Sequence, residues 1–252
     1  MTKIISVTNQ KGGVGKSTTS QALASGLAHL KNKKVLLVDL DSQGNATYAT
    51  GENEIDITVY EVMRGMENIK NAIYETEFID ILPASKRLAQ LDVELTDVGK
   101  EYKLKESLDE IKSYYDYIII DTPPALGVLT INALTASDYI VIPSQADVYS
   151  VQGIGMLMDN FQNVKKYSNK NLKILGILLT RYNARTILSN EMKDMISDTA
   201  QQIGTFLYKT VIREAIAIKE AQALRQDIFN YSSKSNPAAD YHDFIDELLE
   251  RI

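Results

Sequence analysis

The stretch "VTNQKGGVGKSTTS", residues 7–20 of a 252-residue chain, decides the fold. Its core, "KGGVGKST", follows an apolar run at 3–8 that is typical of a buried strand, and it precedes a helical pattern at 17–30. A strand, a glycine-rich turn, a Lys-Ser pair and a helix in this order predict a phosphate-binding loop. A plain glycine turn is the alternative, and the joint occurrence of the four features weighs against it.

The residue types in this loop predict how it would hold phosphate. Glycines let backbone N–H groups turn toward phosphate oxygens, and the amino terminus of the helix adds a positive field. Lys16 is expected to contact the β and γ phosphates, Ser17 to ligate Mg²⁺, and Thr18 to bind the α phosphate. The nucleotide-binding residues predicted in the loop are Gly12, Gly13, Val14, Gly15, Lys16, Ser17 and Thr18.

Short β-rich runs alternate with longer helical patterns along the rest of the chain. Several of the runs are apolar throughout, which is typical of parallel strands buried on both faces. The alternation predicts an α/β fold, a doubly wound and mainly parallel sheet, in a single domain spanning 1–252. In such sheets, ligands bind at the carboxyl ends of the strands. The predicted strands are 3–8, 34–40, 117–121, 139–143 and 173–180, and the predicted helices are 17–30, 84–95, 100–114, 150–167, 187–203 and 237–251.

The composition excludes several kinds of chemistry. The chain has no cysteine, which rules out disulfides, thiolate metal sites, iron–sulfur clusters and a cysteine nucleophile. No apolar stretch approaches the length of a membrane span, and the first apolar run is too short for a signal peptide, so a cytoplasmic protein is expected. The net charge of −6 would repel DNA and anionic lipid, so either partner would have to meet a local basic patch.

A second lysine in the loop needs its own explanation. The usual pattern, G-x-x-x-x-G-K-[ST], would place a glycine at Gln10, and this loop carries Lys11 in addition to Lys16. The variant resembles the deviant Walker A motif of the ParA/MinD ATPases, a superfamily of P-loop NTPases that bind ATP. The resemblance implies that Lys11 reaches across an ATP-bound homodimer to the partner's phosphates, so that both lysines are catalytic. From the residues alone, a solvated loop lysine is the simpler interpretation of Lys11.

Two acidic segments resemble further parts of the same superfamily. In "VLLVDLDSQGNAT", the resemblance implies that Asp41 positions and polarises the attacking water and that Asp39 lies near the Mg²⁺ shell. A strand-end carboxylate that caps the next turn is the alternative for Asp39. In "YDYIIIDTPPALG", Asp121 has the form of a Walker B carboxylate that holds Mg²⁺ through water, and 122–127 resembles the second switch, which senses the γ phosphate. Ser17, Asp39 and Asp121 are therefore the expected metal-site residues.

Several branches of the superfamily do not fit this sequence. Nitrogenase iron proteins and arsenite pumps need cysteines, and tyrosine autokinases carry a tyrosine cluster at the carboxyl terminus, where this chain has only Tyr241. MinD ends in a basic amphipathic helix that lies on a membrane. The tail "YHDFIDELLERI" is acidic, and each charge would be repelled by about 1 kcal/mol near an anionic surface. Its Phe244, Leu248 and Leu249 fit the apolar stripe of a helix docked on the core, so no membrane partner is expected.

The ParA/Soj branch, which comprises DNA-partition ATPases, remains. "LLTRYNARTILSNEM" resembles a segment in which an arginine after the sixth strand contacts DNA, and that arginine would be Arg185. "TVIREAIAIKEAQA" resembles a second segment, with Arg213 and Lys219 at its basic positions, but it lacks the usual proline after Ile212. A surface ion pair is the alternative for each of these basic residues. "NPAADY" resembles the loop that borders the adenine, with Pro237 against the base.

These resemblances cover nearly the whole chain and predict a cytoplasmic, nucleoid-associated ATPase. It is expected to dimerise on ATP, to bind DNA without sequence preference, and to be released by hydrolysis that a centromere-binding, ParB-like partner stimulates. No helix-turn-helix pattern precedes Lys3, so a short form without sequence-specific promoter binding is expected. Two alternatives stay open: an ATP-dependent adaptor that positions a protein cargo, and a metabolic ATP-dependent ligase. Lys11 and the Arg185 segment weigh against the ligase.

Overall fold

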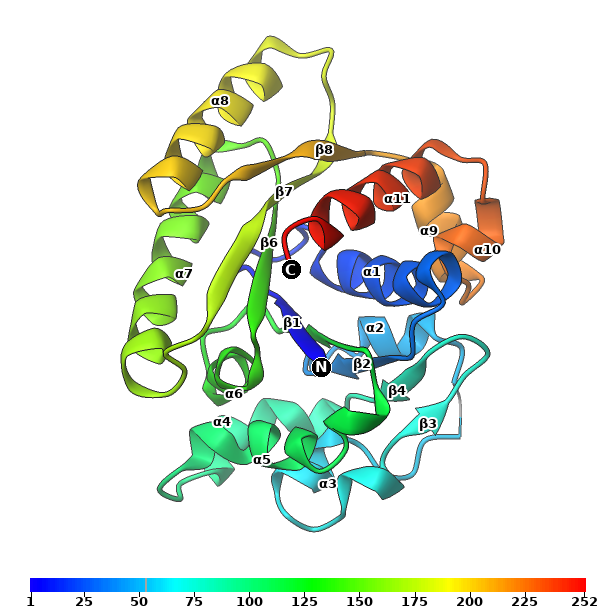
Figure 1. Cartoon of the computed structure of the whole chain (residues 1–252), viewed down its shortest axis with the longest axis vertical. Coiled ribbons are helices and arrows are strands. Elements are labelled where there is room, and N and C mark those ends of the chain that lie inside the picture. The colour runs from blue at the N-terminus through cyan, green and yellow to red at the C-terminus, as the bar shows by residue number, and fades with distance from the viewer. Residues whose placement is uncertain (53) are drawn as a thin grey trace.

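One eight-stranded sheet runs through the computed structural model, which describes residues 1–52 and 54–252 (Figure 1). The strands are β1 (Lys3–Val7), β2 (Val35–Asp39), β3 (Tyr74–Glu75), β4 (Asp80–Leu82), β5 (Tyr117–Asp121), β6 (Tyr139–Ser144), β7 (Lys173–Tyr182) and β8 (Leu207–Arg213). Their order in the sheet is β3-β4-β2-β5-β1-β6-β7-β8. The paired strands are parallel, apart from an antiparallel edge formed by β3 and β4. The predicted doubly wound α/β class is confirmed.

Helices cover both faces of this sheet. The α-helices are α1 (Lys16–Lys31), α2 (Asn45–Ala49), α3 (Val59–Met63), α4 (Leu91–Glu94), α5 (Lys103–Asp109), α6 (Val128–Ala136), α7 (Val148–Tyr167), α8 (Ile187–Gln202), α9 (Ile216–Ala223), α10 (Ile228–Ser232) and α11 (Asn236–Leu249). Short 3-10 turns lie at Ile69–Asn71, Lys86–Gln90, Lys100–Tyr102 and Lys112–Tyr114. In Figure 1, α1 and α11 lie together on one side of the sheet, and α6 and α7 lie on the other.

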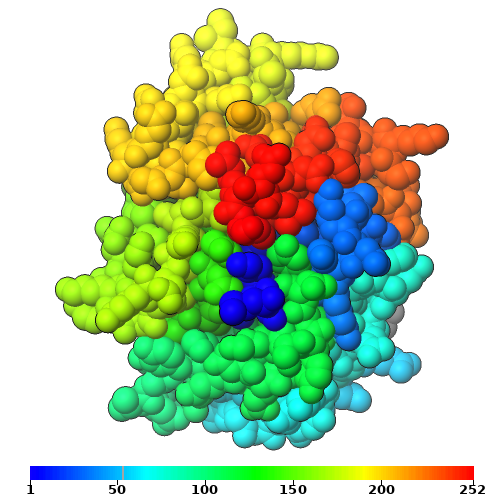
Figure 2. Space-filling model, viewed as in Figure 1, coloured from blue at the N-terminus to red at the C-terminus, as the bar shows by residue number. Residues whose placement is uncertain are grey.

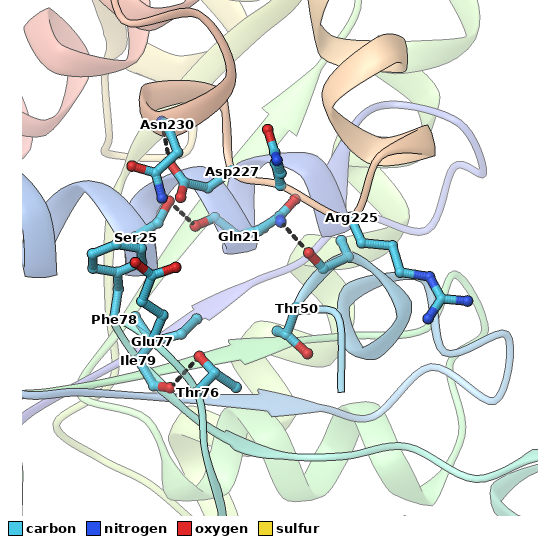
Figure 3. Close-up of a pocket in the computed structure, with 12 residues that line it drawn as sticks. Gln21, Ser25, Thr50, Thr76, Glu77, Phe78, Ile79, Arg225, Asp227 and Asn230 are labelled. Carbon is cyan, nitrogen blue, oxygen red and sulfur yellow. Dashed lines mark hydrogen bonds between the residues drawn. The ribbon is translucent and has the colours of Figure 1, made fainter. Parts of the chain in front are cut away.

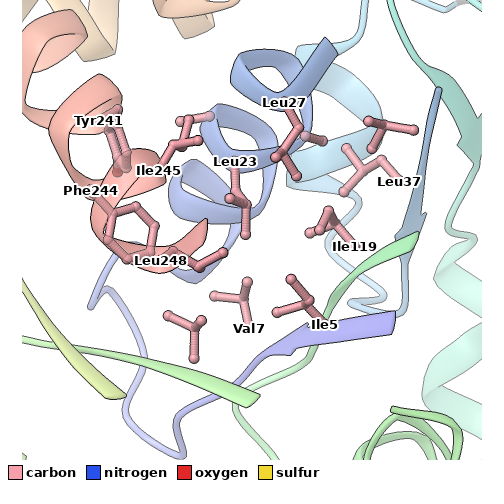
Figure 4. Close-up of a cluster of buried hydrophobic side chains, with 14 of the residues drawn as sticks. Ile5, Val7, Leu23, Leu27, Leu37, Ile119, Tyr241, Phe244, Ile245 and Leu248 are labelled. Atoms are coloured by element: carbon pink, nitrogen blue, oxygen red, sulfur yellow. The ribbon is translucent and has the colours of Figure 1, made fainter. Parts of the chain in front are cut away.

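Side chains of each central strand enter the cores on both faces. Ile5 of β1 belongs to the core under α1 and α11, whereas Ile4 belongs to the core on the opposite face. Successive side chains of a strand point to opposite faces, so a strand covered on both sides is apolar throughout. Figure 4 shows Phe244 and Leu248 of α11 packed with Leu23 of α1 in the first of these cores. The acidic tail is therefore the docked helix that its apolar stripe predicts.

The strand order places the end of β1 at a switch point. The chain passes from β1 to β2 on one side of the sheet, and after β5 it crosses to β6, β7 and β8 on the other side. Helical connections that leave in opposite directions open a crevice at the carboxyl ends of the central strands. The phosphate loop follows β1 at this crevice.

The sequence patterns predicted some elements wrongly. All five predicted strands are present, but the helices predicted at 84–95 and 100–114 are divided into 3-10 turns and the short helices α4 and α5. Leu88 and Leu91 are buried at helical spacing, yet the backbone of Leu95 is extended, with ψ of 95°, and ends α4. Strand β8 is not among the predicted strands, since the prediction for its segment rests only on the basic residues. It pairs with β7 in an irregular register, which shifts between Ile177 and Leu179 and again between Leu179 and Tyr182. Gly176 lies at the bulge between β7 and β6, and its φ of +147° is a conformation that a larger residue rarely adopts.

Both ends of the chain reach the same surface. In Figure 2 the first residues lie directly beside the carboxyl-terminal helix on one face of the molecule. Across 1–52 and 54–252, no helix combines the length and the apolar character needed to cross a membrane.

Candidate active site

The phosphate loop joins β1 to α1 through residues 8–15. Gly13 and Gly15 have φ of +76° and +83°, which residues with a Cβ rarely adopt. Gly15 stands at the N-cap of α1, and none of the described side chains caps that end of the helix. The first N–H groups of α1 are thus left for a ligand, as an anion-binding helix terminus requires.

Side chains from neighbouring strands hold this loop in place. The Thr180 hydroxyl lies 2.8 Å from the Val14 carbonyl oxygen, and Gln145 Nε2 donates to the Gly13 carbonyl at 3.1 Å. Asn9 Nδ2 donates to the Pro143 carbonyl at 2.7 Å, and Asn9 Oδ1 accepts the Lys11 N–H at 3.0 Å. The carbonyl groups of Gly13 and Val14 therefore point toward the ends of β6 and β7. The bonds hold the loop in this conformation before a ligand binds.

Lys16 lies inside a cavity of about 610 Å³ whose walls include Gly12, Ser17, Asp41 and Pro124. Its side chain is buried, and Nζ donates to the Lys11 carbonyl oxygen at 3.1 Å. Burial lowers the pKa of Lys16, while the charges of Asp121 and Asp41 act in the opposite direction. An ammonium group at the floor of a cavity that is large enough for a nucleotide is suited to binding phosphate.

Asp39 and Asp41 differ in their surroundings. Asp41 lines the cavity, and its Oδ1 accepts the N–H of Gln43 at 3.0 Å. The Asp39 carboxylate is fully buried and accepts three bonds, from the N–H of Asp41 at 3.0 Å and from the N–H and hydroxyl of Thr47 at 2.7 and 2.8 Å. Burial raises the pKa of Asp39 to about 6, against these hydrogen bonds. This geometry favours the capping interpretation of Asp39, and its place near a metal stays a prediction.

Asp121, at the end of β5, is the carboxylate whose surroundings best fit a metal site. Its Oδ1 accepts the Ser20 hydroxyl at 3.0 Å, whereas its buried Oδ2 has no hydrogen-bond partner among the described residues. Burial and the nearby charge of Asp39 raise the pKa of Asp121, while the hydroxyls of Ser17 and Ser20 and the charge of Lys16 oppose this. Within the described chain no cluster of three or more His, Cys, Asp or Glu residues forms a closed metal cage. Mg²⁺ needs none, because it is bound by one or two carboxylates, waters and phosphates.

Lys11 has a partner on its own chain. Its ammonium group forms an ion pair with Asp147, the N-cap residue of α7, and its side chain is 25% exposed. Burial would raise the pKa of Asp147, but the bonds from Lys11 and from the Ser150 N–H hold it below its usual value. Lys11 is therefore neither fully solvated nor directed into the cavity of its own chain. Whether it reaches a partner's phosphates stays a prediction.

The three basic residues assigned to DNA differ in how they are held. The side chain of Arg185, in the exposed loop after β7, forms no ion pair within the described residues. Arg213 forms the ion pair that was its alternative interpretation: Nε donates to both oxygens of Asp240 on α11, at 3.1 and 2.9 Å. Its side chain is still 49% exposed, and its contact with DNA stays a prediction. Lys219 lies on α9 and is exposed.

A second cavity, of about 170 Å³, adjoins the phosphate loop on the side of β8 and α9. Gly15 and Thr18 form one wall, and Arg213, Lys219 and Gln222 belong to the other. Pro237 is buried in the first turn of α11, and it lines neither of the two cavities beside the loop. Its predicted contact with the base has no support from this geometry and stays a prediction.

A smaller pocket of about 90 Å³ lies beside α1, away from the glycines of the loop (Figure 3). Gln21 and Ser25 of α1 face Thr76 and Phe78, and Asp227 and Asn230 close it from the segment that begins α10. None of the predicted site residues lines this pocket, and its walls are largely satisfied by their own hydrogen bonds, such as Gln21 Nε2 to the Ala49 carbonyl at 2.9 Å.

Four residues of the site were not predicted: Gln145, Asp147, Thr180 and Gln222. Gln145 and Asp147 follow β6 closely, so the rule that sites lie at carboxyl ends of parallel strands could have drawn attention to them. Thr180 ends the predicted fifth strand in the same way. Gln222 lies on an unpredicted helix, and no local pattern indicates that it meets the phosphate loop.

Comparison with known proteins gives consistent matches. A family described as an AAA domain matches residues 2–174. The sporulation initiation inhibitor protein Soj of Bacillus subtilis is 42% identical over 98% of this chain and 98% of its own length. Among solved structures, a cobyrinic acid a,c-diamide synthase of Mycobacterium smegmatis with bound ATP analogue and magnesium has a TM-score of 0.86 and 33% identity, over 99% of this chain and 95% of that one. A plasmid partition protein of Borrelia burgdorferi has a TM-score of 0.80 and 26% identity, with both chains covered completely.

Proposed function

This chain belongs to the ParA/Soj family of partition ATPases, and from that membership we propose that it segregates DNA. In this proposal it dimerises on ATP, binds DNA without sequence preference, and leaves DNA when a centromere-binding, ParB-like partner stimulates hydrolysis. It acts in the cytoplasm, on the nucleoid, as a single domain. The observation that carries the proposal is the loop with two lysines, Lys16 in the cavity and Lys11 held beside it by Asp147.

The residues around the cavity fit a nucleotide with magnesium. Lys16, Thr18 and the N–H groups of the loop would bind the phosphates, and Ser17 and Asp121 would hold Mg²⁺, with the unpartnered Asp121 Oδ2 accepting from a metal-bound water. The ATP analogue and magnesium of the synthase structure support this assignment. Bound Mg²⁺ would neutralise charge on the β and γ phosphates. Asp41, which lines the same cavity, would orient the attacking water.

The ion pair with Asp147 gives Lys11 a defined position before dimerisation. Lys11 and Asp147 are both about one-third exposed or less, and their contact lies at the start of α7, beside the loop. In a dimer, the partner's phosphates would compete with Asp147 for the ammonium group. Charge-assisted bonds to phosphate are strong enough to displace an ion pair that is partly open to water.

Lys11→Ala is expected to bind nucleotide as a monomer but to lose the ATP-dependent dimer, because no charge would cross to the partner's phosphates. Asp147→Asn should keep the dimer, since it removes only the competing carboxylate. Sedimentation with a non-hydrolysable ATP analogue measures both, with the exposed Lys33→Ala as a control. A dimer of undiminished stability in Lys11→Ala would make Lys11 only a loop lysine.

Arg185 is the strongest candidate for a DNA contact, because it is exposed and has no ion-pair partner in the described part of the chain. If Arg185, Arg213 and Lys219 each meet one phosphate, a dimer makes about six contacts, and log affinity falls against log salt with a slope near −5. Arg185→Ala should reduce the magnitude of that slope by about 2, equally for any DNA sequence, because phosphate contacts carry no sequence information. DNA affinity over a salt series, with ATP analogue present, tests this.

Lys170→Ala is the matched control for Arg185, because Lys170 is exposed just before the opposite end of β7. Its salt slope should equal that of the wild type. An unchanged slope in Arg185→Ala would remove Arg185 from the DNA face. If Arg213 and Lys219 also leave the slope unchanged, the cargo-adaptor alternative is favoured.

A metabolic ligase is the second candidate, and the likeness to a solved structure named as a synthase favours it. The same measurements separate the three functions. A partition ATPase forms an ATP-dependent dimer that binds DNA in a salt-sensitive way. A cargo adaptor forms the dimer without binding DNA, and a ligase has no need of Lys11 in trans.

A further inference from the structure

Gln222 of α9 contacts the phosphate loop helix over a long separation in sequence. Its Nε2 donates to the Thr18 hydroxyl oxygen at 2.9 Å, and 204 residues separate the two. Gln222 also lines both cavities beside the loop, the larger one with Lys16 and the smaller one with Arg213 and Lys219. Gln222 thus connects Thr18, a predicted phosphate-binding residue, to the segment that carries Arg213 and Lys219, two of the predicted DNA contacts.

The direction of this hydrogen bond matters for nucleotide binding. A threonine hydroxyl has one hydrogen to donate and lone pairs to accept. Because the Thr18 oxygen accepts from Gln222, its own hydrogen stays available for an acceptor, such as a phosphate oxygen. A phosphate, Thr18 and Gln222 would then form a continuous chain of hydrogen bonds that ends on α9.

Helix α9 is lightly attached to the rest of the protein. It has eight residues, no described side chain caps its first turn, and Ala221 is its only buried residue. Ala217 and Ile218 are only partly buried against the core. In the described part of the chain, the side-chain hydrogen bonds from α9 to other elements are Gln222 with Thr18 and Glu220 with Tyr231 of α10. Segments with few buried contacts open most easily and are suited to shift when a ligand binds. Arg213, in contrast, is tied to Asp240 and lies outside the helix.

We propose that Gln222 is a positioning residue that couples nucleotide binding at Thr18 to the orientation of α9 and its Lys219. The inference rests on the proposed DNA function and adds the route by which the nucleotide state reaches the DNA face. Coupling of this kind is reciprocal, so the factor by which nucleotide raises DNA affinity equals the factor by which DNA raises nucleotide affinity.

Two variants of Gln222 test the coupling. Gln222→Met keeps the size of the side chain without the donor, and Gln222→Glu replaces the donor by an acceptor that would take the Thr18 hydrogen. We expect Gln222→Met to weaken nucleotide binding about fivefold, as the loss of one net hydrogen bond does, and Gln222→Glu to weaken it further by charge repulsion. The ratio of DNA affinities with and without ATP analogue should fall in both variants.

Gln226→Met is the control, because Gln226 follows α9 and its side chain forms no hydrogen bond to the phosphate loop within the described residues. Labelled ADP gives the nucleotide affinity, and labelled duplex DNA gives the affinity ratio. If Gln222 had a purely structural role, the variants would change the nucleotide affinity but not the ratio of DNA affinities with and without nucleotide. If wild-type DNA binding depends on nucleotide and Gln222→Met keeps the same ratio, the role of Gln222 is overturned. If the wild type binds no DNA in any nucleotide state, the proposed function itself falls, together with this coupling.

Discussion

Replacing Lys16 by alanine is expected to abolish ATP binding at concentrations that saturate the wild-type protein. Its buried ammonium group would make charge-assisted hydrogen bonds to the β and γ phosphates, each worth about 2 kcal/mol. The loss of both corresponds to a roughly thousandfold rise in the dissociation constant. Equilibrium titration with a fluorescent ATP analogue measures it.

Thermal unfolding separates this loss of binding from a loss of fold. Burial lowers the pKa of Lys16, so its positive charge opposes folding in the nucleotide-free protein at neutral pH. The unfolding temperature of Lys16→Ala should therefore not fall, although added ATP should no longer raise it. Wild-type nucleotide affinity in Lys16→Ala would contradict the assignment of the phosphate loop.

Asp41→Ala is expected to bind ATP and dimerise but to hydrolyse slowly. The carboxylate lines the cavity, and in the proposed mechanism its removal would leave the attacking water without an orienting group, which typically slows such a step by about 10²-fold to 10⁴-fold. The variant should stay on DNA, because the proposed cycle releases DNA only after hydrolysis. Single-turnover hydrolysis and the rate of dissociation from DNA are the two measurements.

Asp41→Asn distinguishes the charge of Asp41 from its structural role. The amide oxygen of Asn can still accept the Gln43 N–H, so the turn after β2 should be kept while the negative charge is lost. Asp159→Ala, at an exposed position of α7, is the control and should hydrolyse normally. A wild-type single-turnover rate in both Asp41 variants would mean that another residue orients the water.

Local patterns in the sequence were sufficient for the phosphate loop and for the central strands. The order of strand, glycines, Lys16 and helix lies within one short window, and the left-handed conformations of Gly13 and Gly15 follow from residue type. Strands such as β5, whose central residues Ile118–Ile120 are all apolar, indicate burial on both faces without reference to any other segment. The apolar stripe of α11 likewise predicts, from local sequence alone, that this helix packs against the core.

Elements whose form depends on partners far along the chain could not be predicted in this way. Strand β8 exists because β7 offers it an edge to pair with, and the helix expected at 84–95 is shortened although its leucines have helical spacing. In both segments tertiary contacts outweigh local propensity.

The sequence by itself determined which residues could bind phosphate, because that chemistry is encoded by residue type at short spacing. The tertiary structure alone decided which partner each polar group has: Lys11 pairs with Asp147, Arg213 pairs with Asp240, and the Thr18 hydroxyl accepts from Gln222. A charge or a donor that loses water on folding must find a partner wherever the fold provides one, and in the first and last of these pairs the partner comes from more than a hundred residues away.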